Sequence, residues 1–111
     1  MNVTIKDLEA YLHQNYAERV NEQALFMKLI EEIGEVAEIL NMRSGAKKAS
    51  EEDMQAQLAY ELADVIHYAV AIAAINGIDL NETILSKDKK ASVKYNRAVN
   101  LESFISERNC G

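Results

Sequence analysis

Residues 54–72 read MQAQLAYELADVIHYAVAI, and the fold and the site both depend on how this stretch is interpreted. Each residue of a helix advances about 100° around the axis, so one stripe of about 80° collects Met54, Leu58, Val65, Tyr68 and Ile72. Glu61 lies at the centre of this apolar stripe, and Asp64 lies about 60° to one side of it. Two carboxylates in such a position require a neutralising partner, because an uncompensated buried carboxylate is costly.

The chain before this stretch predicts two further helices. TIKD at 4–7 has the form of a capping box and precedes apolar residues at helical spacing, so we expect a first helix over about 4–18. NEQ at 21–23 opens a second helix, which ends near the loop RSGAKKA at 43–49. Ser50 and Asp53 form another capping box, and the third helix runs from there to Asn76 and Gly77.

The chain after this stretch is also helical in pattern. DLNE at 79–82 caps a fourth helix that extends through SKDKKASVKYNR at 86–97, and LESFI at 101–105 predicts a short last segment. Four main helices with short connections predict an all-α, antiparallel, four-helix bundle-like fold. The 111 residues are 49% hydrophobic with no Pro and four Gly, which suits one helical domain over 1–111.

Charge and cysteine content restrict the partners and the compartment. The net charge of -6 argues against nucleic acid or an anionic membrane as the main partner, since both are bound through clustered Lys and Arg. Cys110 is the only cysteine, so no intrachain disulfide forms. The N-terminus does not resemble a signal peptide, and no uninterrupted apolar run approaches the ~18 residues of a membrane span. We therefore expect a cytoplasmic protein.

A second group of acids lies in KLIEEIGEVAEIL at 28–40. Glu32 and Glu35 repeat the three-residue spacing of Glu61 and Asp64, so two adjacent antiparallel helices could bring four carboxylates together. Pairing with Lys or Arg and a solvated acidic face are the structural alternatives. A divalent cation would also neutralise the cluster, and an all-oxygen ligand set favours Mg²⁺ or Mn²⁺ over Zn²⁺. Because Mg²⁺ bridges phosphates, the substrate class is a phosphorylated small molecule.

A di-iron site is the weaker interpretation of these acids. Asp64-x-x-His67 is similar to the Glu-x-x-His element of di-iron bundles, but those bundles need two such elements. His13, the other histidine, has no acid three residues before it. We expect both histidines to be hydrogen bonded or exposed.

These motifs resemble a known family. Glu31-Glu32-x-x-Glu35 followed by Glu61-x-x-Asp64 is similar to the EExxE…ExxD signature of the MazG-like, all-α nucleoside triphosphate pyrophosphohydrolases. KLIEEIGEVAEIL resembles the first motif helix, ELADVIHYAVAIAAINGIDL the second, and KYNR at 94–97 the basic motif that follows. The resemblance spans residues 25–97.

The resemblance implies a MazG-type fold and Mg²⁺-dependent hydrolysis of (deoxy)nucleoside triphosphates between the α and β phosphates. It also implies homodimers or homotetramers with active sites near subunit interfaces, and a role in removing unwanted nucleotides. Carried over by motif, Glu32, Glu35, Glu61 and Asp64 match the metal-binding positions. Glu31 would hold a second metal or deprotonate the attacking water.

Cations are needed for the phosphates beyond the metal. Lys94 and Arg97 are candidates because their spacing places both on one helical face, and Lys28 is a third. Solvated or intrahelical ion pairs are the alternatives, and Lys28 can pair with Glu31 or Glu32. No base-binding residue is identified, and Tyr68 and Tyr95 either stack on a base or pack. The competing function is a non-catalytic helical module that uses its acids to bind metal or a basic protein.

Overall fold

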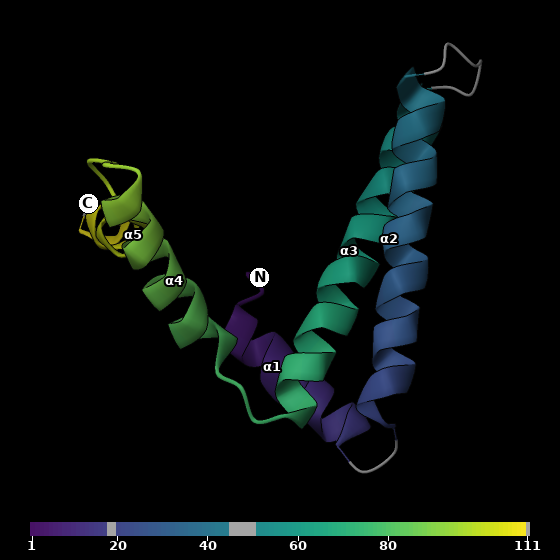
Figure 1. Ribbon diagram of the computed structural model, residues 1–111, viewed down its shortest axis with the longest axis horizontal. Helices are drawn as coiled ribbons and strands as arrows, with labels where there is room; N and C mark the ends of the chain where they lie inside the picture. Colours follow the sequence, from purple (N-terminus) through teal and green to yellow (C-terminus); the bar gives the residue numbers. More distant parts are fainter. Residues whose placement is uncertain (18–19, 45–50, 111) are drawn as a thin grey trace. The chain divides into compact units, whose positions relative to one another are not determined.

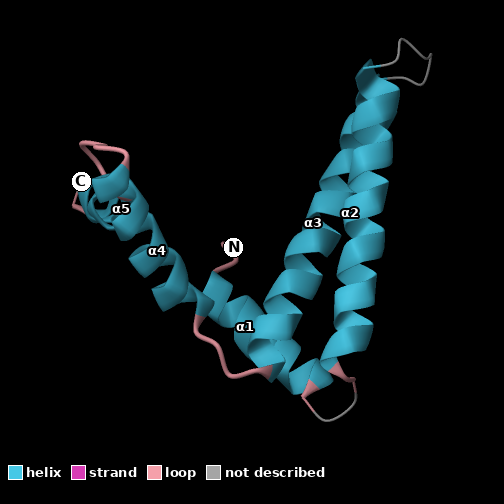
Figure 2. Ribbon diagram, viewed as in Figure 1, coloured by secondary structure: helices cyan, strands magenta, loops and turns pink. Residues whose placement is uncertain are grey.

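The structure, a computed structural model, describes residues 1–17, 20–44 and 51–110. These residues form helices and no strand, which confirms the all-α class (Figures 1 and 2). The helices are α1 Ile5–Tyr16, α2 Glu22–Ser44, α3 Glu51–Ile75, α4 Leu80–Lys94 and α5 Leu101–Asn109. The chain divides into two compact units, Met1–Ile78 and Asp79–Gly111, which are described separately. The single domain over 1–111 stays a prediction.

The first unit is built around α3. Helices α2 and α3 lie side by side and antiparallel, and α1 packs against α3 (Figure 1). Leu12 of α1 is fully buried, and the other buried apolar residues of this unit are Leu25, Ile39, Met54, Val70, Ala71, Ala73 and Ala74. The antiparallel α2–α3 pair is the arrangement that the acid spacing required.

Side chains cap the first two helices as their sequences predicted. Thr4 Oγ1 accepts a hydrogen bond from the Asp7 amide at 3.0 Å, and Asn21 Oδ1 accepts one from the Ala24 amide at 2.7 Å. These bonds satisfy amides that have no partner within the helix. The predicted cap at Ser50 and most of the predicted loop at 43–49 lie outside the described residues.

Helix α3 ends at the glycine that the sequence indicated. Gly77 has a φ of 66°, the left-handed conformation that glycine adopts without a Cβ penalty. The amide of Ile78 donates to the carbonyl of Ala73 at 3.0 Å, and that of Gly77 donates to Ala74 at 3.3 Å. This pair of bonds is a Schellman motif, which satisfies the last carbonyls of the helix.

Helix α4 ends three residues earlier than expected, so the prediction of a common helical face for Lys94 and Arg97 is wrong. Asn96 has a φ of 54°, and its amide donates to the carbonyl of Val93 at 3.2 Å. The amide of Arg97 donates to the carbonyl of Ser92 at 2.8 Å, which completes a second Schellman motif. Lys94 is therefore the last residue of α4, and Arg97 lies beyond its C-terminus.

The second unit joins α4 to α5 through a side chain. Asp88 Oδ2 accepts a hydrogen bond from the amide of Leu101, the first residue of α5, at 2.6 Å. Asn100 and Ser103 form a capping box at the same end of α5. The predicted short segment at 101–105 is therefore a helix of nine residues, because both a cap and a neighbouring carboxylate satisfy its first amides.

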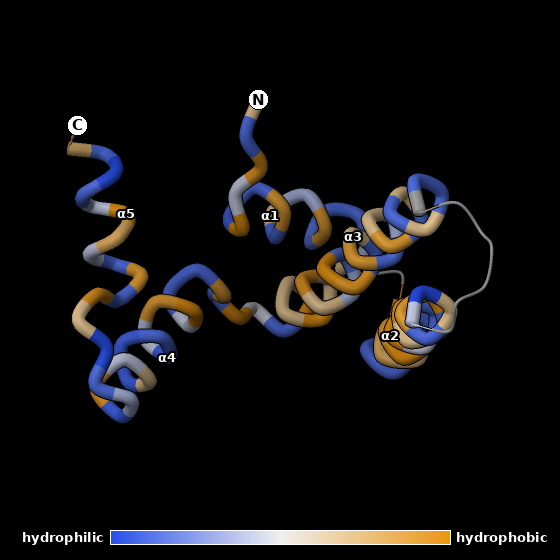
Figure 3. Tube along the Cα trace, turned by 90° about the horizontal axis from the view of Figure 1, so that it is seen from above, coloured by the Kyte–Doolittle hydropathy of each residue, from blue (hydrophilic) through white to orange (hydrophobic). Residues whose placement is uncertain are grey.

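Many residues of α2 and α3 are apolar, as the orange segments of Figure 3 show, and several of their large side chains are exposed in the single chain. The exposed large apolar residues include Phe26, Ile30, Ile33 and Leu40 on α2, and Leu62 and Ile66 on α3. By length and composition alone, the segment 52–75 of α3 could cross a membrane, with a hydropathy of 1.5. The same stretch carries Glu61 and Asp64 and packs against both α1 and α2.

Candidate metal centre

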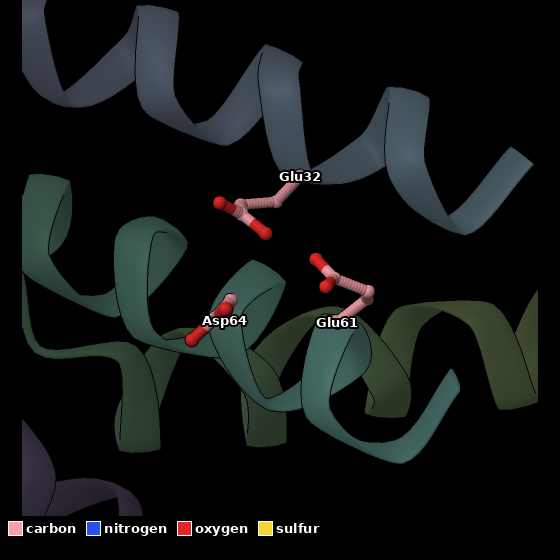
Figure 4. Close-up of side chains that lie close together, drawn as sticks. All are labelled: Glu32, Glu61 and Asp64. Carbon is pink, nitrogen blue, oxygen red and sulfur yellow. The ribbon is translucent and has the colours of Figure 1, made fainter. Parts of the chain in front are cut away.

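Three carboxylates meet between α2 and α3. Glu32 comes from α2, Glu61 and Asp64 come from α3, and one carboxylate oxygen of each lies within 4.8 Å of the other two. Figure 4 shows Glu32 and Glu61 extending toward each other from the two helices. The convergence follows from sequence, because acids at matched spacing on two antiparallel helices face each other where the helices pack.

One oxygen of Glu32 and one of Glu61 are buried without a partner among the described residues. Among the described residues, no donor reaches Glu32 Oε2 or Glu61 Oε2. Both residues are half-buried, and Asp64 is exposed. Buried polar atoms in folded proteins are nearly always hydrogen bonded or bound to an ion or water. Water, a proton or a cation would satisfy these two oxygens, and a cation would also neutralise the group of carboxylates.

The acids compete for protons in the metal-free protein. The neighbouring carboxyl of Glu32, then that of Glu35, and then burial raise the pKa of Glu61 from 4.5 to about 8. Two carboxyl groups can hydrogen bond only when one of them carries a proton, and the close contact therefore favours protonated Glu61. A divalent cation would take the place of this proton and leave the carboxylates ionised.

The residues present fit a small, hard divalent cation. All the donors are carboxylate oxygens, which suit Mg²⁺ or Mn²⁺ rather than Zn²⁺. Opposite ligands of Mg²⁺ are about 4.2 Å apart, from bonds of about 2.1 Å. Neighbouring ligands are about 3.0 Å apart, and at least two of the three pairs must be neighbouring, so the oxygens, now within 4.8 Å of one another, would close on the ion by side-chain rotation.

Glu35 and Glu31 lie at the edge of this group. Glu35 is exposed and outside the set of three, but it is close enough to Glu61 to raise the pKa of that carboxyl. Glu31 Oε2 lies 3.3 Å from Lys28 Nζ, and the two side chains are 59% and 56% exposed. This is the intrahelical ion pair that the sequence offered as the alternative for Lys28. The hydrogen bond and the charge of Glu31 also raise the pKa of Lys28. Their catalytic and phosphate-binding roles stay predictions.

Lys94 and Arg97 belong to the second unit. Arg97 Nη1 lies 3.9 Å from Asp88 Oδ1, and Lys94 Nζ lies 5.3 Å from the centroid of the Tyr95 ring. Arg97 therefore forms an ion pair, which was the alternative to phosphate binding that the sequence allowed. Binding of phosphate by either residue remains a prediction.

The two histidines are as expected, hydrogen bonded or exposed. His67 Nε2 lies 2.8 Å from the hydroxyl of Tyr16, and His13 is exposed on α1. The sequence assigned no role to Tyr16. It could not reveal this contact, because Tyr16 and His67 are 51 residues apart and meet only through the packing of α1 on α3.

Comparison with known proteins identifies the family of the chain. Residues 20–97 match the MazG nucleotide pyrophosphohydrolase domain. Over 92 residues the chain is 35% identical to dCTP pyrophosphatase 1 of Rattus norvegicus, an alignment that covers 76% of this chain and 54% of that protein. The chain thus spans about half the length of this curated relative.

A solved structure has a similar fold. The crystal structure of iMazG from Vibrio DAT 722 aligns with a TM-score of 0.65 and 29% sequence identity, over 86% of this chain and 100% of the other. The matched domain contains α2, α3 and α4, and therefore all five acids at the EExxE…ExxD positions. This chain belongs to the MazG nucleotide pyrophosphohydrolase family.

Proposed function

We propose that the protein hydrolyses (deoxy)nucleoside triphosphates to the monophosphate and pyrophosphate in the presence of Mg²⁺. The observation that carries this proposal is the convergence of Glu32, Glu61 and Asp64, with two buried oxygens that have no donor among the described residues. Family membership supplies the reaction class, and the rat relative is named for dCTP. We therefore propose dCTP as the first substrate to test, with base preference open.

The residues of the site support a division of labour. Glu32, Glu35, Glu61 and Asp64 would hold the metal, which supplies charge neutralisation on the phosphates when it is bound. Glu31 is the candidate proton acceptor for the attacking water, since a carboxylate within reach can act as a general base. Its ion pair with Lys28 would have to open for that role.

Cations on both units are candidates for the phosphates. Lys28 is exposed and lies beside the acids, so its ammonium could move from Glu31 to a phosphate oxygen at little cost. Lys94 and Arg97 are proposed as further phosphate ligands on the basis of the family resemblance. They would act from two different local structures, the end of α4 and the segment after it.

The assembly and the location are also proposed. The uncovered apolar residues of α2 and α3 support a homodimer or homotetramer, because contiguous apolar surface of this kind marks an interface in soluble proteins. We expect a cytoplasmic protein that removes unwanted nucleotides, with no nucleic-acid or membrane partner.

The test is product analysis with a panel of dNTPs and NTPs. Each nucleotide is incubated with the protein and Mg²⁺, with Mn²⁺, or with a chelator, and the products are separated by anion-exchange chromatography. We expect monophosphate and pyrophosphate in equal amounts, and only with divalent metal. Nucleoside diphosphate and orthophosphate would show cleavage between the β and γ phosphates, which would contradict the proposed reaction. No product from any nucleotide would favour the non-catalytic metal-binding or protein-interaction module.

A further inference from the structure

Three aromatic rings connect α1 to the helix that carries the metal-site acids. The hydroxyl of Tyr16, the last residue of α1, lies 2.8 Å from Nε2 of His67 on α3. The same two rings pack edge to face, with centroids 5.7 Å apart and planes at 89°. His67 in turn packs on Tyr68, with centroids 4.8 Å apart and planes at 73°. All three rings are half-buried.

This cluster lies directly next to the acids along α3. His67 and Tyr68 are three and four residues after Asp64, so both neighbour this acid on the helix surface, and Glu61 lies one turn before it. The hydrogen bond is part-buried and joins residues 51 positions apart. It therefore fixes this turn of α3 against another helix, whereas a bond within α3 would leave its rotation free.

The rotation of α3 matters because the metal site is shared between helices. A carboxylate oxygen lies about 6 Å from the helix axis, so a rotation of about 10° moves it by about 1 Å. Mg²⁺ demands near-ideal octahedral geometry, with bonds that vary by about 0.1 Å. Side-chain adjustment absorbs only part of such a displacement, so the rotation of α3 affects how well Glu61 and Asp64 meet Glu32 at a cation.

We propose that Tyr16 and His67 are positioning residues, whose hydrogen bond fixes the rotation of α3 and so holds Glu61 and Asp64 for metal binding. The inference rests on the proposed function, because the metal site is what these residues would serve. Neither residue is among the carboxylates that would bind the metal, and neither is proposed to contact the nucleotide. Groups that hydrogen bond directly to a metal ligand change metal affinity by about 10–100-fold when they are removed, and we expect the lower end of this range for an indirect contact such as Tyr16–His67.

The experiment measures binding of Mn²⁺ alone, by the loss of its free electron paramagnetic resonance signal, with no nucleotide present. Tyr16→Phe removes one hydroxyl and keeps the ring, and we expect it to weaken Mn²⁺ binding about tenfold. His67→Leu should weaken it equally. His67→Gln places a side-chain amide near the position of Nε2, and this amide can donate or accept a hydrogen bond. We expect it to restore most of the Mn²⁺ affinity that His67→Leu loses.

The double variant and a matched control separate positioning from general stability. Tyr16→Phe combined with His67→Leu should bind Mn²⁺ no more weakly than either single variant, since both remove the same bond. Tyr11→Phe removes a hydroxyl from an exposed tyrosine on the same helix and should bind Mn²⁺ like the wild type. Thermal unfolding of each metal-free variant, followed by circular dichroism, shows that it is folded.

The outcomes that overturn the proposal differ from those that overturn the proposed function. Wild-type Mn²⁺ affinity in folded Tyr16→Phe would overturn the positioning role. Losses of Mn²⁺ affinity that add in the double variant would also overturn it, and so would a His67→Gln variant that binds Mn²⁺ no better than His67→Leu. Absence of Mn²⁺ binding by the wild type would overturn the metal site and this proposal with it. Tight binding by the wild type without hydrolysis of any nucleotide would overturn only the proposed function.

Discussion

Protonation of Glu61 links the stability of the metal-free protein to pH. Its pKa is raised to about 8 in the folded state, mainly by Glu32, against 4.5 ordinarily. The folded protein therefore binds this proton more tightly than the unfolded chain does. The stabilisation is fully present below about pH 4.5 and is lost as the pH rises through about 8.

We expect the midpoint temperature of thermal unfolding of the metal-free protein to decrease as the pH is raised from about 5 to about 9. In Glu61→Gln this part of the pH dependence should disappear, because the amide does not titrate. Equal slopes in the two proteins would show that the acids are not coupled as described.

Addition of Mg²⁺ should reverse the loss at high pH. A ligand that binds only the folded state raises its stability by an amount that grows with ligand concentration. At about pH 8.5 we expect millimolar Mg²⁺ to raise the unfolding midpoint of the wild type clearly and that of Glu61→Gln little, because the variant lacks one ligand. Equal shifts in both proteins would place the bound ion elsewhere.

At the scale of single residues, spacing in the sequence was sufficient to bring together Glu32, Glu61 and Asp64, and insufficient for Glu35, the cations and Tyr16. Glu32, Glu61 and Asp64 converge because helical periodicity is regular and both helices run unbroken through the motif. Arg97 departs from the prediction because Asn96 takes a left-handed conformation that ends α4. Apart from Gly, Asn adopts the left-handed conformation most readily, so the Asn in KYNR already indicated that the helix could end there.

At the scale of elements, the stop at Gly77 contributes to how α3 is held. A Cβ at this position meets no atom within 4 Å, so the cost of Gly77→Ala comes from its φ of 66° alone. We expect Gly77→Ala to lower the free energy of unfolding by about 1 kcal/mol, measured by urea denaturation at fixed protein concentration.

Gly34 is the matched control for this prediction. It lies inside α2, and a Cβ there also meets nothing within 4 Å of the chain, but its backbone is helical. Gly34→Ala should raise the free energy of unfolding by about 0.5–1 kcal/mol, because alanine loses less conformational entropy in a helix. Changes of the same sign in both variants would contradict the conformational explanation.

Helix positions were predicted more closely than helix contacts. Apolar periodicity and capping residues located α1, α2 and the end of α3, because these signals act within a few residues of each other. The length of α5 was underestimated, because Asp88, thirteen residues before Leu101, satisfies one of its first amides. Long-range contacts of this kind leave no local pattern in the sequence.

At the scale of the whole molecule, the exposed apolar residues of α2 and α3 predict assembly. We expect sedimentation equilibrium to give the mass of a dimer or tetramer. Phe26→Lys places a charge on this surface, where Phe26 is 51% exposed in the single chain, and should shift the equilibrium toward monomer. Val3→Lys, at an equally apolar residue outside the helices that is 78% exposed, should leave the mass unchanged. A monomeric wild type would contradict the proposed assembly.

The central claim is that Glu32, Glu61 and Asp64 hold the metal at which nucleoside triphosphates are hydrolysed, and pyrophosphate release by Glu61→Gln tests it most directly. The matched control is Glu38→Gln, which removes an exposed carboxylate of α2 outside the acid cluster. With dCTP and Mg²⁺, we predict that Glu61→Gln releases pyrophosphate about 10²-fold or more slowly than the wild type, while Glu38→Gln remains close to it. Wild-type turnover by folded Glu61→Gln would contradict the claim.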